Sequence, residues 1–81
     1  MVKQQRFETT SRNATQIETF IARLARTVEL LDEDIRGEEE RASVRDPRDP
    51  GYPMRARTLR TRRENLRATI ASLEALVNPV G

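Results

Sequence analysis

Isoleucine, leucine and valine recur along this chain in steps of four and three residues, and this spacing constrains the fold more than any other feature. One series runs from Ile17 to Ile35 and a second from Leu59 to Val80. An apolar residue at every 3.5 positions on average forms a narrow stripe along one side of an α-helix, and a second helix must cover that stripe. The pattern predicts an all-α fold in which two long helices pack as a coiled-coil-like hairpin.

Three of the four prolines lie between the two series, in the segment from Asp46 to Pro53. A proline cannot continue a helix, and it pushes the residue before it out of the helical region. The two helices should therefore be separated by a proline-rich loop within a single helical-hairpin domain, residues 13–78. The predicted plan is a flexible polar tail at 1–12, a helix at 13–45, a loop at 46–52, a helix at 53–78 and a short C-terminal tail at 79–81.

Charges are segregated along the chain, although the net charge is only +2. Residues 29–40 contain seven acids and one arginine, whereas residues 55–67 contain six arginines and one glutamate. Acids near a helix C-terminus and bases near a helix N-terminus both oppose the helix dipole. Antiparallel packing would lay the two blocks side by side and offset this cost, which favours an antiparallel hairpin.

The seam, meaning the residues of the two apolar series, also suggests a register for this hairpin. In the alignment that places each seam residue opposite another seam residue, Ile70 lies beside Leu31, and Ala14 and Ile17 extend beyond the end of the second helix. It also opposes acids of the first helix to arginines of the second. The structural ion pairs predicted from this register are Glu38–Arg63, Glu39–Arg60 and Asp32–Arg67.

The residue types present oppose catalysis. The chain has no histidine and no cysteine, so it lacks the commonest general base, the commonest metal ligand and any disulfide. A seam of leucine, isoleucine and valine offers no concave pocket. We predict that the protein is not an enzyme and that it has no catalytic, metal-binding or cofactor-binding residues.

Other features concern location and assembly. No apolar stretch approaches the roughly 18 residues of a membrane span, and the N-terminus lacks the apolar centre of a signal peptide, so we expect a cytoplasmic protein without a membrane partner. A chain this short buries only about 60% of its unfolded surface. Apolar residues outside the seam, together with the overhanging Ile17, widen the stripe beyond what one partner helix can cover, which favours a homodimer in the form of a four-helix bundle. The predicted self-association residues are Ile17, Phe20, Leu30 and Leu76.

These features favour a small self-associating protein that acts as a protein–protein interaction or scaffold module. The alternative is a nucleic-acid-associated accessory factor, because arginine-rich helices bind phosphates. The low net charge, the neighbouring acids and the lack of aromatic residues on the second helix favour the first reading. The arginines that would serve the alternative are Arg55, Arg57, Arg60, Arg62 and Arg67.

Overall fold

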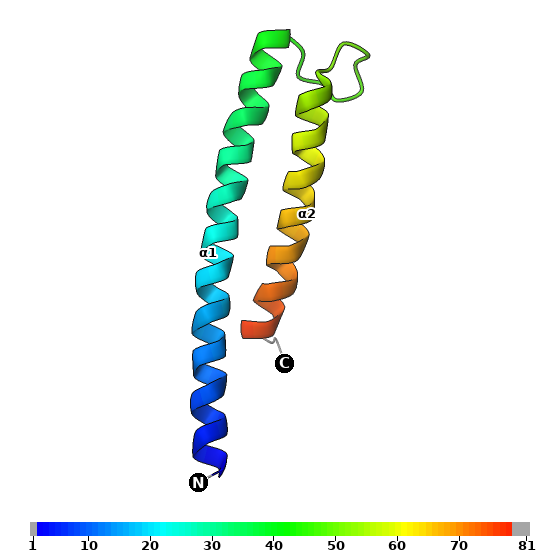
Figure 1. The fold of residues 1–81 in the computed structure, drawn as a ribbon. Coiled ribbons are helices and arrows are strands. Elements are labelled where there is room, and N and C mark those ends of the chain that lie inside the picture. Colours follow the sequence, from blue (N-terminus) through cyan, green and yellow to red (C-terminus); the bar gives the residue numbers. More distant parts are fainter. Residues whose placement is uncertain (1, 79–81) are drawn as a thin grey trace.

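The computed structural model describes residues 2–78, and the side chains from residue 13 onward. This part of the chain contains two helices, α1 at Val2–Ala42 and α2 at Met54–Val77, and no strand. The helices lie side by side and run in opposite directions, joined by a loop at one end (Figure 1). The predicted all-helical hairpin is therefore confirmed.

α1 begins earlier than the sequence suggested. It starts at Val2, so the predicted start at residue 13 is wrong, and residues 2–12 form helical backbone where a flexible tail was expected. No proline or glycine interrupts this segment, and a helix propagates readily once its first turn has formed. The polar composition that suggested a tail does not by itself end a helix. Residues 79–81, the predicted C-terminal tail, lie outside the described residues.

The C-terminus of α1 is closed by its own backbone. Ser43 has a φ of 57°, the left-handed conformation that commonly ends helices. The backbone N–H of Ser43 donates to the carbonyl of Glu40, and that of Val44 donates to the carbonyl of Glu39, both at 3.2 Å. These two bonds form a Schellman motif. α1 consequently ends at Ala42, before the first loop proline and not at residue 45.

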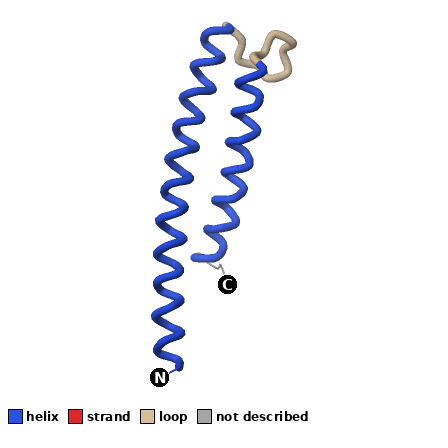
Figure 2. The backbone as a smooth tube through the Cα atoms, in the orientation of Figure 1, coloured by secondary structure: helices blue, strands red, loops and turns tan. Residues whose placement is uncertain are grey.

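The loop covers residues 43–53, which is wider than the predicted 46–52 (Figure 2). Two aspartates shape its turns, because the carboxylate of Asp46 accepts the N–H of Arg48 at 2.9 Å and that of Asp49 accepts the N–H of Gly51 at 2.7 Å. Such side-chain bonds to the backbone two residues on stabilise turns. The loop then directs Tyr52 inward, where only 5% of the residue is exposed.

The fully buried core is small and lies near the loop end of the hairpin. Leu31 and Ile35 of α1 are buried, together with Tyr52 and Ala56. Seam residues farther from the loop, such as Leu24 and Leu73, are only half-buried. A helix with a single neighbour has most of its circumference open to solvent, so the hairpin alone covers only a narrow strip of each helix.

The register of the hairpin differs from the predicted one. The predicted Glu38–Arg63 pair is not formed. Arg63 instead donates to Asp32 at 2.6 Å, and Glu38 forms an ion pair with Arg55 at 3.3 Å. Side chains on a helix lean toward its N-terminus, so arginines of α2 lean toward the loop. Because Arg63 nevertheless meets Asp32, its backbone must lie level with Asp32 or farther from the loop.

A shift of one heptad accounts for these contacts. Seven residues span two turns, so moving α2 by a heptad brings the same seam positions together again. Arg63 then lies beside Leu31, while Leu59 lies beside Ile35 and Val77 beside Ile17. In Figure 1, α2 accordingly ends alongside the blue, N-terminal half of α1. The expected overhang of Ile17 is wrong, since α2 ends at Val77 beside it, whereas Ala14 lies beyond the end of α2 as expected.

Candidate functional site

Three of the four predicted self-association residues are exposed to solvent. Phe20 is 49% exposed, Leu30 44% and Leu76 67%. The fourth, Ile17, is half-buried, because the shifted register places it on the seam opposite α2. Met54 is also exposed, at 75%; it was not predicted, although its place in the first turn after the loop is a signal of exposure.

The exposed residues share one side of the hairpin, which we call the apolar edge and define as Phe20, Leu30 and Leu76. Phe20 and Leu76 each directly precede a seam residue, and in an antiparallel pair such positions border the same flank. The helical rotation of 100° per residue places Leu30 farther out on this same side. In the observed register Phe20 and Leu76 also lie at nearly the same height along the hairpin, at the end away from the loop.

The opposite side, which we call the charged flank, is closed by ion pairs between the helices. Arg60 lies 3.9 Å from Glu39 and Arg67 lies 3.8 Å from Asp32, so both flanking pairs expected from the sequence are present. Asp32 also accepts the short bond from Arg63. The two sides of the hairpin therefore differ in character.

Two groups on the charged flank have perturbed pKa values. The hydrogen bond to Asp32 raises the pKa of the Arg63 guanidinium, so that this seam residue stays charged although its side chain is only 14% exposed. Burial raises the pKa of the Tyr52 hydroxyl above 10.0, and the 2.7 Å hydrogen bond that it donates to Glu39 raises it further. The neighbouring carboxylates favour the protonated form of both side chains, and in this form both side chains connect to acids of α1.

The five arginines of the nucleic-acid alternative fall into two groups. Arg55, Arg60 and Arg67 each have a carboxylate partner. Arg57 and Arg62 form no ion pair with a described carboxylate. The five arginines are distributed around the axis of α2 and do not share one side of it, so they do not form a single continuous basic face.

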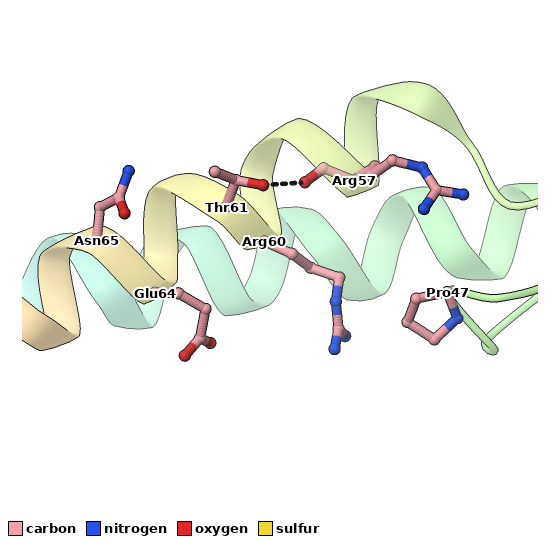
Figure 3. Close-up of a pocket in the computed structure, with 6 residues that line it drawn as sticks. All are labelled: Pro47, Arg57, Arg60, Thr61, Glu64 and Asn65. Atoms are coloured by element: carbon pink, nitrogen blue, oxygen red, sulfur yellow. Dashed lines mark hydrogen bonds between the residues drawn. The ribbon is translucent and has the colours of Figure 1, made fainter.

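A concave site among the described residues lies where the loop meets α2 (Figure 3). It has a volume of about 350 Å³, and we call it the arginine groove. In the view of Figure 3, the guanidinium group of Arg57 lies above the ring of Pro47 and that of Arg60 lies to the left of it. This groove was not predicted from the sequence, although two arginines three residues apart on one helix were a signal of it. Its lining residues are Pro47, Arg57, Arg60, Thr61, Glu64 and Asn65.

Other kinds of site find no support in the described residues. No group of three or more acidic side chains there is arranged to hold a metal ion. No helix within residues 2–78 is both long and apolar enough to cross a membrane. The chain matches no protein-family model, no curated protein and no solved structure. A proposal for its function therefore rests on the apolar edge, the charged flank and the arginine groove.

Proposed function

We propose that this protein is a small, non-enzymatic, cytoplasmic hairpin that self-associates through its apolar edge and serves as a protein-interaction or scaffold module. One observation carries the proposal, namely the exposure of Phe20, Leu30 and Leu76 on one side of the molecule. Exposed leucines scattered singly are ordinary, but large apolar side chains gathered on one side are typical of association surfaces.

The neighbours of the apolar edge also favour association. Thr27, Thr69 and Ser72 occupy the same side of the hairpin and carry no charge, whereas Arg23 and Asp34 on this side are exposed and charged, so contact limited to the uncharged part requires little desolvation of ions. Full burial of a large apolar side chain contributes about 1.5 to 3 kcal/mol, and these side chains are already partly covered. Two copies related by a two-fold axis would bury six such side chains, which favours a homodimer with four packed helices.

The proposal is tested by sedimentation equilibrium of the whole chain at micromolar concentration. We expect a dimer for the natural sequence and a monomer for Leu76→Asp or Phe20→Asp, because each places a charge in the contact. Ala71→Asp is the matched control, since it adds the same charge at an exposed position of α2 away from the apolar edge. Ile17→Asp is less informative, because Ile17 also contributes to the hairpin seam.

Two results would contradict the proposal. The first is a monomeric natural chain that still melts cooperatively. The second is equal disruption by Ala71→Asp and Leu76→Asp, which would show that added charge, and not the apolar edge, governs assembly.

A nucleic-acid-associated accessory factor is the second candidate, because Arg57 and Arg62 have no carboxylate partner among the described residues. Such a function predicts binding to DNA or RNA that weakens steeply as salt rises, since bound phosphates release counterions. The pairing of Arg55, Arg60 and Arg67 with carboxylates of the same chain reduces the positive charge available for this role. We therefore place it second.

A further inference from the structure

The arginine groove contains a guanidinium that is held in place without being neutralised. Arg57 lies over the ring of Tyr52, with 5.5 Å between the guanidinium carbon and the ring centre. Tyr52 is itself fixed, because it is buried and its hydroxyl donates to Glu39. A cation on an aromatic face keeps its N–H donors at the edge of the planar group. Arg57 therefore presents donors to the groove at a reduced cost in side-chain entropy.

The second arginine of the groove is only weakly engaged. The guanidinium of Arg60 lies 3.9 Å from Glu39, which is longer than a charge-assisted hydrogen bond, and its side chain is 37% exposed. Glu39 instead accepts a shorter hydrogen bond from the Tyr52 hydroxyl, at 2.7 Å. A ligand carboxylate between Arg57 and Arg60 would therefore displace little existing interaction.

The remaining lining favours a peptide over a nucleic acid. Glu64 is held in the groove wall by Arg63 at 3.2 Å and Arg67 at 3.1 Å, and its carboxylate can accept a backbone N–H of a peptide, a donor that a phosphate backbone lacks. Asn65 offers an amide that suits the hydrogen-bonding groups of a peptide backbone. Pro47 supplies an apolar surface for the methylene groups of a glutamate side chain.

We propose that the arginine groove binds an acidic segment of a protein partner, with one carboxylate held between Arg57 and Arg60 and its aliphatic part against Pro47. This inference rests on the proposed protein-interaction function and specifies the chemistry of the partner. Two guanidinium groups on one carboxylate provide the charge-assisted hydrogen bonds that are strongest in proteins. Because Arg57 and Arg60 come from one helix and Pro47 from the loop, the groove exists only when the loop is folded against α2.

The test uses the whole chain and a fluorescein-labelled hexaglutamate peptide, with binding followed by fluorescence anisotropy at low salt. We expect hexaglutamate to bind and hexaglutamine not to bind. Arg57→Gln should weaken the affinity about tenfold, as expected for the loss of a hydrogen bond to a charged group. Arg62→Gln is the matched control, because it removes the same charge from an unpaired arginine of α2 outside the groove, and it should change the affinity less than about twofold.

Three results would overturn the inference. One is the absence of hexaglutamate binding to the natural chain, and another is equal weakening by Arg57→Gln and Arg62→Gln, which would indicate attraction to net charge alone. The third is tighter binding of single-stranded hexathymidylate than of hexaglutamate, with the same dependence on Arg57, which would make the groove a phosphate site. Circular dichroism confirms that each variant remains helical.

Failure here is distinguishable from failure of the proposed self-association. Arg57→Gln lies on α2 near the loop, far along the hairpin from Phe20 and Leu76, and should sediment like the natural chain. A chain that dimerises but does not bind hexaglutamate would overturn only the groove. A natural chain that binds hexaglutamate as a monomer would overturn only the self-association.

Discussion

The two sides of this hairpin differ in the interactions that their side chains form. On the charged flank, acids of α1 meet arginines of α2, and the buried Tyr52 connects the loop to Glu39. On the apolar edge, Phe20, Leu30 and Leu76 remain exposed. Directional ion pairs select which parts of the helices meet, whereas an exposed apolar side gains most of its stabilisation only when a second surface covers it. One side therefore defines the hairpin, whereas the other stays exposed and is the surface through which we propose that the protein associates.

The largest expected effect is the loss of stability when a core side chain between the two sides is shortened. Ile35 is 2% exposed, so Ile35→Ala should lower the free energy of unfolding by about 2 to 4 kcal/mol, because it removes buried methyl groups and leaves a cavity. Leu30→Ala on the apolar edge should change it by less than about 0.5 kcal/mol when the chain is monomeric. Urea denaturation followed by circular dichroism measures both values.

Similar losses for Ile35→Ala and Leu30→Ala would break the comparison. They would show that Leu30 is covered within the monomer, and that the apolar edge belongs to the fold and not to an association surface. Repeating the measurement at increasing protein concentration sharpens the test. If the apolar edge mediates association, the effect of Leu30→Ala should grow with concentration, because dimer formation adds to the measured stability.

The second-largest expected effect is on stability, and it compares an aspartate on the charged flank with an aspartate on the other side of α1. Asp32→Ala removes the carboxylate that accepts from Arg63 at 2.6 Å and leaves this largely buried guanidinium with only Glu64. The loss of unfolding free energy should be about 1 to 3 kcal/mol. Asp34→Ala removes the same group from an exposed position on the other side of α1, where no partner is described, and should cost less than about 0.5 kcal/mol.

The Asp32 result also tests the register. If Arg63 were paired with Glu38, as the sequence suggested, Glu38→Ala would be the damaging substitution and Asp32→Ala would be mild. In the structure Glu38 lies against Arg41 and Arg55, whose side chains are 70% and 75% exposed and can be hydrated when the carboxylate is lost. The order of the two losses in denaturation therefore distinguishes the two alignments.

The difference between the predicted and observed registers has a physical cause. Apolar spacing identifies which face of each helix is covered, and the charge blocks favour antiparallel packing, so both helices and their orientation could be predicted. A heptad repeat, however, looks the same after a shift of seven residues. The flanking pairs Glu39–Arg60 and Asp32–Arg67 fit either alignment, because arginine side chains reach along the helix. The seam arginine distinguishes the two alignments, since its partner is Asp32 and not Glu38, and the pairing of Glu38 with Arg55 agrees with it.

The candidate site could be predicted only in part, for reasons that also depend on individual residues. Exposure of Phe20, Leu30 and Leu76 follows from their places beside the seam, so their spacing revealed them. The arginine groove depends on the path of the loop, which Asp46, Asp49 and Ser43 determine through turn and cap hydrogen bonds. Periodicity carries no information about such a path. The inward position of Tyr52, and hence the stacking of Arg57, could not be obtained from it.

The smallest effect concerns Tyr52, the link between the loop and the charged flank. Its pKa in the folded chain is raised above 10.0, mainly by burial and then by the hydrogen bond to Glu39. The contribution of the protonated phenol to stability is therefore fully present below pH 10.0 and is lost as the pH rises through the folded pKa, because the unfolded chain releases this proton first. The free energy of unfolding should fall with pH in this alkaline range.

Tyr52→Phe is the matched variant for this prediction. It keeps the buried ring beneath Arg57 but removes the titrating hydroxyl, so its stability should be lower at neutral pH and should vary less with pH above 10.0. Tyr52 is the only tyrosine of the chain, so tyrosinate absorbance reports its ionisation directly. An unfolding free energy that declines equally in both proteins would place the alkaline sensitivity elsewhere. A decline confined to the natural chain would show that the charged flank, unlike the apolar edge, is sensitive to the protonation of one buried group.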